Sequence, residues 1–210
     1  MNRLVLTTLL PSLLLLLPLL GCGTRSDDAA GSRPNREQAV AIAKIERLGG
    51  KVRYDDKAVG RPIYSVDFYE TGIGDDTLRT VAGLTELKVL ILGNTQVTDA
   101  GLEHIKPLTQ LRCLLLGNTR VTDAGLEYIT ACMHLEDLDV SSTQVTDTGL
   151  KQIGKLVALR RLSLDDLQIT NAGLGHLQEL KALRSLSTIG TRVTPDGLKE
   201  LKNALPNLEK

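Results

Sequence analysis

Three histidines and three cysteines are the side chains best suited to catalysis or metal binding in this 210-residue chain. His104 and His176 occupy the same position of a 24-residue repeat, three units apart. Since neighbouring strands of a sheet are ~4.8 Å apart, two such rings should lie at least about 14 Å from each other and cannot share a metal. His134 precedes a predicted strand. We therefore expect three surface histidines and no metal centre.

Two of the cysteines lie in the repeat region and offer no better site. Cys132 replaces a leucine of the predicted core, whereas Cys113 should face the opposite side of the sheet, so the two should not form a disulfide. Neither has the histidine or other base that activates a nucleophile. Segment 72–75 contains glycines, but it is a turn of the repeat and not a phosphate or dinucleotide loop. The sequence thus predicts a protein that is not an enzyme and binds no cofactor.

The third cysteine, Cys22, follows an apolar N-terminal segment. Arg3 precedes the apolar run 4–20, which has the length of a secretory signal. The run ends in L-L-G-C, which resembles the lipobox of bacterial lipoproteins, where the signal is cut before the cysteine and the thiol takes a diacylglycerol. This resemblance implies that residues 1–21 are a lipoprotein signal peptide and that Cys22 is the lipidation site.

Segment 22–35 is small and polar and lacks apolar periodicity, which predicts a flexible tether. The resemblance implies a protein held by lipid at the membrane of a bacterial cell envelope, on its periplasmic or outer-membrane side. Two alternatives remain open: a signal that is cleaved without lipidation, and an uncleaved anchor. The apolar run contains two prolines and is short for a membrane span, which makes the uncleaved anchor the weaker alternative.

The composition limits the range of partners. Lys plus Arg and Asp plus Glu both number 25, and only 2% of the residues are aromatic. A chain with no net charge and few rings offers neither the basic surface nor the stacking platform of a nucleic-acid-binding protein. Its core must be filled by aliphatic side chains in a regular arrangement.

Most of the chain is a repeat that aligns without gaps. Segments 84–105 and 108–129 share the pattern L-T-x-L-x-x-L-x-L-G-N-T-x-V-T-D-A-G-L-E-x-I, and the same frame restarts at Cys132, Leu156 and Leu180. The pattern resembles the leucine-rich repeat family, and is most similar to the helix-containing types of bacterial proteins and of F-box leucine-rich-repeat proteins. The resemblance covers about residues 61–210, which hold six units.

Each unit combines two short elements. The alternating L-x-L predicts a strand with one buried face, and the segment after it predicts a helix. A helix of about eight residues is too short to be stable alone, so neighbouring units must build a shared core. We therefore predict an α/β fold: a right-handed leucine-rich repeat solenoid with a parallel inner sheet and short outer helices.

Three recurring residues position each helix. The predicted N-caps are Thr98, Thr122, Thr146, Thr170 and Thr194. The next position holds an acid in three units, which the helix dipole favours, and a proline in the last unit: Asp99, Asp123, Asp147 and Pro195. A glycine follows three residues after the cap, at Gly101, Gly125, Gly149, Gly173 and Gly197. Since glycine destabilises a helix by about 1 kcal/mol relative to alanine, its recurrence predicts a close contact that a methyl group would obstruct.

The turn after each strand departs from the family pattern, which usually has asparagine there. A hydroxyl can also bond to local backbone, so we expect regular turns at the threonines and an irregular one at Leu167. The threonines are Thr71, Thr95, Thr119, Thr143 and Thr191.

The ends of such a solenoid must be closed. Segment 36–60 is the predicted N-terminal cap, with an amphipathic helix over 36–48 and an edge strand over 52–55. At the other end the last strand is polar, which discourages end-to-end growth. The closing segment 204–208 is short, which leaves a homodimer through this end open.

The candidate binding site is the concave face of the predicted sheet. The outward positions at its centre, which we expect to be exposed, are Val89, Ile91, Cys113 and Leu115. Polar residues and tyrosines flank them: Tyr64, Asp67, Tyr69, Asp137, Asp139 and Arg161. An exposed apolar patch with a polar rim is typical of a protein-binding surface. The alternative interpretation is that small aliphatic side chains tolerate a half-exposed sheet, with Asp137 and Arg161 as an ion pair of little energetic value.

The sequence therefore predicts a non-enzymatic protein-interaction module, lipid-anchored at the cell envelope, that holds a partner protein on its concave sheet. One alternative is a structural envelope lipoprotein without a specific ligand. Another, implied by the likeness to F-box proteins, is a substrate adaptor in ubiquitin ligation. That adaptor requires a helical F-box before the repeats, where this chain has a signal-like segment instead.

Overall fold

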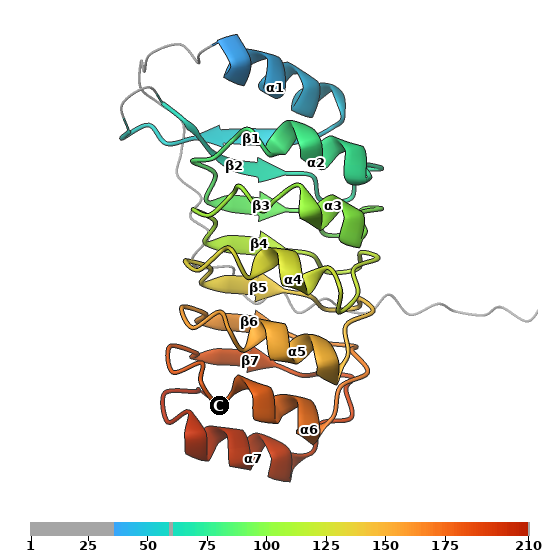
Figure 1. Ribbon diagram of the computed structural model, residues 1–210, viewed down its shortest axis with the longest axis vertical. Coiled ribbons are helices and arrows are strands. Elements are labelled where there is room, and N and C mark those ends of the chain that lie inside the picture. Colours follow the sequence, from blue (N-terminus) through green and yellow to red (C-terminus); the bar gives the residue numbers. More distant parts are fainter. Residues whose placement is uncertain (1–35, 59–60, 210) are drawn as a thin grey trace, which may run out of the picture.

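The computed structural model describes residues 36–58 and 61–209. In this part of the chain, seven strands form one sheet in the order of the sequence, and the helices stack beside them as a second column (Figure 1). The arrangement confirms the predicted α/β solenoid with a parallel inner sheet and short outer helices. The predicted signal peptide, the tether and Cys22 lie outside the described residues.

From β2 onward, strands and helical segments alternate along the described chain. The strands are β1 (Lys51–Tyr54), β2 (Ile63–Asp67), β3 (Val89–Ile91), β4 (Cys113–Leu115), β5 (Asp137–Asp139), β6 (Arg161–Ser163) and β7 (Ser185–Ser187). The helices are α1 (Arg36–Arg47), α2 (Asp75–Val81), α3 (Asp99–Glu103), α4 (Leu126–Ile129), α5 (Asp147–Ile153), α6 (Asn171–Leu174), the 3-10 turn η1 (Gly175–Leu177) and α7 (Pro195–Ala204).

The register of the sheet follows the sequence repeat. Strand β1 pairs antiparallel with β2, and every later strand is parallel to its neighbour. Val89 pairs with Cys113, which in turn pairs with Asp137. The same spacing appears beyond the strands, where Asn118 donates a hydrogen bond to Asn94, 24 residues earlier. Equivalent residues therefore form rows that run along the solenoid.

An aliphatic core lies between the sheet and the helices. The inward strand residues Leu90 and Leu114 and the helix residues Leu102 and Leu126 are fully buried. Phe68, the only phenylalanine of the chain, is buried at the N-terminal end, where its ring leaves no room for a side chain at Gly50. Each unit thus contributes a few leucines, and stacking provides the rest of the hydrophobic contact.

Most of the repeat helices are shorter than the predicted eight residues: α3 has five, and α4 and α6 have four each, whereas α7 has ten. Four of the predicted N-caps are confirmed, because the hydroxyls of Thr98, Thr146, Thr170 and Thr194 accept a backbone N–H at their helices. Thr122 is the exception. Its hydroxyl accepts from the N–H of Ala124 at 3.3 Å, but α4 begins only at Leu126 with Gly125 as N-cap.

The delayed start of α4 has a local cause. The backbone N–H groups of Glu127 and Tyr128 donate to carbonyls three residues earlier, which is 3-10 geometry. The first turn after Thr122 is therefore tighter than an α-helical turn, and the prediction of an N-cap at this residue was wrong.

The prediction about the post-strand turns was correct for the threonines and wrong for Leu167. The hydroxyls of Thr95 and Thr119 donate to carbonyls three residues earlier at 2.6 and 2.7 Å. Asp166 precedes Leu167 and is equivalent to Asn118 in the repeat. Its φ of 57° is close to the 55° of Asn118, so the backbone of the Leu167 turn is regular. Leu167 is fully buried, and its packing in the core replaces the missing hydrogen bond.

Both ends of the described region are covered by local elements. At the N-terminal end, α1 is followed by Gly49, whose φ of +83° turns the chain into β1. At the C-terminal end, Leu205 and Leu208 are buried, and the N–H of Glu209 donates to the carbonyl of Arg184 at 2.7 Å. A homodimer through this end stays a prediction. None of the helices in the described residues is long and apolar enough to cross a membrane.

Candidate functional site

The face of the sheet that points away from the core, here the open face, carries most of the predicted binding residues. Ile91 and Leu115 lie side by side on β3 and β4 and are half-buried. Val89 and Cys113, two residues earlier on the same strands, are only 5% and 2% exposed. The prediction that all four apolar side chains are exposed to solvent was therefore wrong for Val89 and Cys113.

Long side chains account for the burial of these two residues. Val89 and Cys113 lie in a hollow of about 320 Å³ that is also lined by Tyr64, Arg112 and Arg161. Side chains of this length extend over their shorter neighbours and keep water from them. The exposed apolar part of the open face is consequently limited to Ile91, Leu115 and their surroundings.

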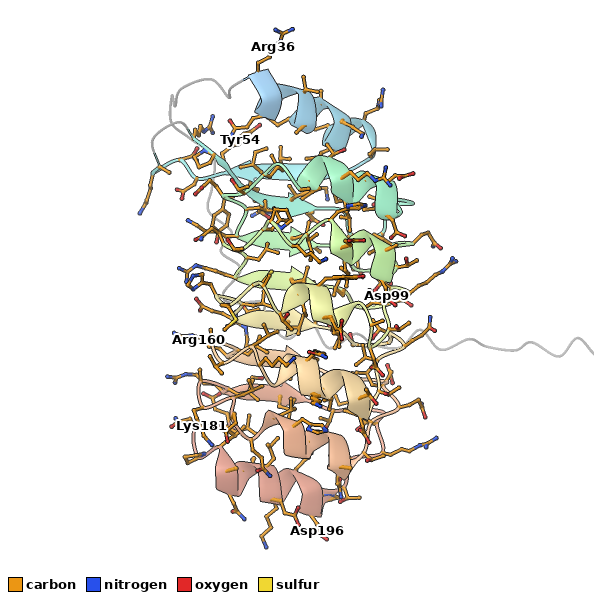
Figure 2. The ribbon with its side chains drawn as sticks, in the orientation of Figure 1. Arg36, Tyr54, Asp99, Arg160, Lys181 and Asp196 are labelled. Carbon is orange, nitrogen blue, oxygen red and sulfur yellow. The ribbon has the colours of Figure 1, made fainter. Side chains whose placement is uncertain are left out.

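Equivalent residues at the beginning of β2 and directly before β3 to β7 form a row, here the strand-start row: Tyr64, Lys88, Arg112, Glu136, Arg160 and Arg184. The Lys88 ammonium lies 5.6 Å from the centre of the Tyr64 ring. The Glu136 carboxylate binds both Arg112, at 2.5 Å, and Arg160, at 3.2 Å. Figure 2 shows Arg160 at the edge of the sheet where the parallel strands begin, opposite Asp99.

Sequence reasoning found Tyr64 but missed the charged members of this row. The 24-residue spacing of these residues is visible in the sequence. In the structure, the backbone N–H of each member from Lys88 onward donates to the carbonyl of the member one repeat earlier. The row offers polar contacts to a partner, and Glu136 is the acidic member that pairs with two of its basic residues, Arg112 and Arg160.

Asp137, on β5, forms the predicted ion pair with Arg161, at 2.5 Å. Only one of its carboxylate oxygens takes part. The other, Oδ1, is buried and has no hydrogen-bond partner among the described residues. Burial raises the pKa of Asp137, although the charge of Arg161 opposes this shift.

The parallel strands end at the opposite edge of the open face, which we call the strand-end edge. Tyr69 follows β2 and is 48% exposed, and its backbone N–H donates to Asp67 at 2.9 Å. The Tyr69 ring lies over Gly93, since a Cβ atom at Gly93 would be 3.1 Å from the ring. The Asp139 carboxylate lies over Gly117, where a Cβ atom would be 2.8 Å from Oδ2.

Hydrogen bonds hold the Asp139 side chain in this position. Its Oδ1 accepts from both the backbone N–H and the hydroxyl of Ser141, at 2.9 and 2.6 Å. One unit further, Asp165 accepts from the hydroxyl of Ser187 and from the N–H of Ile189. The strand-end edge is therefore a row of oriented carboxylates with an exposed tyrosine at one end.

Among the described residues, the three histidines and the two cysteines Cys113 and Cys132 form no cluster that could hold a metal ion. His104 is half-buried and accepts a hydrogen bond from Arg79 at 3.2 Å, and His134 and His176 are exposed. Burial raises the pKa of the Cys132 thiol to about 11, which disfavours the reactive thiolate. Within the described part of the chain, no group of three or more His, Cys, Asp or Glu residues could hold a metal ion.

Comparison with known proteins identifies the type of repeat. The Leucine Rich repeat family matches residues 131–154. No curated protein matches the chain. The solved structure of an internalin (InlF) from Listeria monocytogenes is similar, with 25% identity and a TM-score of 0.54 over 62% of this chain and 36% of the internalin. The chain thus spans about a third of the length of that protein.

Two further structures are similar at lower identity. The leucine-rich repeat ectodomain of the receptor kinase SOBIR1 from Arabidopsis thaliana has 19% identity and a TM-score of 0.55, over 76% of this chain and 96% of the ectodomain. The PEPR1–AtPEP1 structure has 16% identity and a TM-score of 0.50, over 75% of this chain and 25% of that one. These likenesses show the fold, which is a leucine-rich repeat solenoid.

Proposed function

We propose that this leucine-rich repeat solenoid is a non-enzymatic module that binds a partner protein on the open face of its sheet. The proposal rests on one observation: Ile91 and Leu115 form an apolar centre on a face that no helix of the described residues covers. An apolar centre with a polar rim is the usual composition of a protein-binding surface. Leucine-rich repeat folds are typical of interaction modules, and the oriented side chains of both edges fit that use.

The experiment is affinity capture from bacterial envelope extracts in mild detergent, with the 210-residue chain as bait. In one variant, Ile91→Lys and Leu115→Lys place two charges at the apolar centre. We expect a protein that binds the unchanged chain to be lost with this variant, because a lysine cannot be buried there without a partner for its charge.

A matched control places the same two charges elsewhere. Met133 and Val157 lie in the loops before β5 and β6 and are 50% and 52% exposed, so Met133→Lys with Val157→Lys should retain the captured protein. Both variants should unfold cooperatively with urea. A captured protein that binds equally well to the Ile91/Leu115 variant would contradict the proposed binding face, and capture of no protein by the unchanged chain would favour a structural lipoprotein without a specific ligand.

We further propose that the module is attached to the envelope through lipid on Cys22. The support is the sequence L-L-G-C at residues 19–22 after an apolar run. Radiolabelled palmitate fed to an expressing bacterium should label the unchanged chain and not Cys22→Ser, because only a thiol accepts the diacylglycerol. Cys113→Ser serves as control. Equal labelling of Cys22→Ser would contradict this part of the proposal.

A further inference from the structure

The two edges of the open face differ in how their charges are compensated. In the strand-start row and beside it, the basic residues Lys88, Arg112, Arg160 and Arg161 have acidic partners, whereas Arg184 has no ion-pair partner among the described residues. The acidic residues of the strand-end edge have no ion-pair partner among the described residues. They are Asp67, Glu70, Asp139, Asp165 and Asp166. The strand-end edge thus carries negative charge that the fold itself does not neutralise.

An exposed ring lies on this edge beside the carboxylates. Tyr69 covers Gly93 and the carboxylate of Asp139 covers Gly117, and these two glycines belong to neighbouring repeats. Since adjacent strands are ~4.8 Å apart, the ring and the carboxylate stand about one strand spacing from each other. A tyrosine face and a carboxylate at this separation can both contact a single guanidinium or ammonium group.

One buried acceptor of the same face also has an unused oxygen. Asp137 lies two residues before Asp139 on β5, and its Oδ1 has no hydrogen-bond partner among the described residues. This observation is independent of the charges on the strand-end edge.

We propose that the partner contacts this face with a basic segment, whose arginine or lysine side chain binds between Tyr69 and Asp139 while an apolar side chain packs on Ile91 and Leu115. This inference rests on the proposed function and specifies the chemistry of the partner. Charge complementarity favours a basic segment over an acidic one, because an acidic segment would meet the uncompensated carboxylates of the strand-end edge. The apolar pair next to that edge supplies the anchor.

The probe is a fluorescein-labelled peptide of alternating leucine and arginine, about eight residues long, which at ~3.3 Å per residue can cross the central strands of the open face. Its leucine–glutamate counterpart is the control peptide. Fluorescence anisotropy is measured with the 210-residue chain in non-ionic detergent, against a blank with detergent alone. We expect the arginine peptide to bind and the glutamate peptide not to bind, with affinity that falls as salt is raised.

Substitutions then locate the bound peptide. Tyr69→Leu with Asp139→Asn removes the ring and the charge while the amide oxygen can still accept from Ser141, so we expect roughly a tenfold loss of affinity. The matched control is Tyr128→Leu with Asp76→Asn, which removes the same groups from α4 and α2 on the helix side. That control should bind the arginine peptide as the unchanged chain does.

The outcomes separate this inference from the proposed function. Equal affinity for both peptides, binding of neither, or indifference to the Tyr69/Asp139 substitutions would each overturn the basic-segment inference. If the chain prefers the glutamate peptide and the Ile91→Lys/Leu115→Lys variant does not bind it, the basic-segment inference is wrong. The proposed binding of a partner on the open face would then still be supported. Analytical sedimentation gives the oligomeric state. If the unchanged chain is a dimer and the Tyr69/Asp139 substitutions dissociate it, the open face binds a second copy of the chain, and the basic-segment inference is wrong.

Discussion

The carboxylate of Asp99 binds both the backbone N–H and the hydroxyl of Thr122, at 2.8 and 2.6 Å, although the two residues are 23 positions apart and belong to successive repeats. The same contact joins Asp75 to Thr98 and Asp147 to Thr170. Each of these aspartates is the first residue of one helix and fixes a threonine of the next repeat, which at Thr98 and Thr170 is the N-cap of the next helix. The result is a ladder of hydrogen bonds along the helix side of the solenoid.

The ladder predicts the effect of removing one carboxylate. Asp99→Ala should lower the free energy of unfolding by about 1–3 kcal/mol, because the half-buried N–H of Thr122 loses its acceptor. Asp99→Asn should cost less, since Asn171 already makes the equivalent contacts to Thr194. Urea denaturation measures both. Asp76→Ala, whose side chain is 95% exposed, is the control, and an equal loss in that variant would refute the role of the ladder.

The ladder also explains the glycine that recurs after each cap. A methyl group at Gly149 would overlap the Asp123 carboxylate and lie 2.9 Å from Leu126. Gly149→Ala should therefore destabilise the protein by about 1–3 kcal/mol despite the better helix propensity of alanine. Gly175→Ala is the matched control, because nothing lies within 4 Å of a Cβ atom there and the backbone is helical. Urea midpoints that rise for both variants would contradict this explanation.

Asp137 predicts a pH dependence of stability. Burial raises its pKa above the ordinary value of 3.8, so the folded state holds this proton more tightly than the unfolded state. At a pH below 3.8, Asp137 is protonated in both the folded and the unfolded state, and its burial does not lower the free energy of unfolding through a buried charge. At a pH above the raised pKa of the folded state, the buried charge lowers the free energy of unfolding by its full amount. Asp137→Asn, which resembles the protonated form, should raise the urea midpoint at pH ~7 and lose this advantage near pH ~3.

The control for Asp137 is Asp76→Asn, which removes an exposed charge on α2 and should show no such change between the two pH values. A lower urea midpoint of Asp137→Asn at neutral pH would mean that the ion pair with Arg161 outweighs the cost of burial.

Cys132 should react with iodoacetamide only when the protein unfolds. Its thiol is fully buried and its pKa is raised to about 11, so little thiolate forms at neutral pH. Mass spectrometry of digested samples, taken with and without urea, would measure the modification at each cysteine. Rapid modification of Cys132 in the absence of urea would show that the unit around it opens locally.

Much of the fold follows from periodicity alone. The alternation of Leu90 and Leu92 predicts a strand, and the recurrence of Thr98 and its equivalents predicts where helices begin, because both patterns depend on neighbours in sequence. The prediction failed at Thr122 and Leu167, where a tighter turn and packing in the core decide the local structure. Propensity cannot show either effect, because both depend on contacts within the folded stack.

The candidate site was predictable only in part. Strand alternation correctly assigned Ile91 and Leu115 to the open face, but it could not show that Val89 and Cys113 are buried there. Their exposure depends on the long side chains of neighbouring rows, which periodicity does not position.

By itself, the sequence determined the repeat spacing, the positions of the strands and of most helices, the aliphatic core and the side of the sheet on which each residue lies, because all of these follow from short-range patterns repeated at one spacing. Only the tertiary structure decided that Asp99 binds Thr122 and that Asp137 keeps an oxygen without a partner. It also decided that Tyr69 and Asp139 cover neighbouring glycines. Such contacts join residues of different repeats, and their existence depends on how closely the units stack and which rotamers that stacking allows.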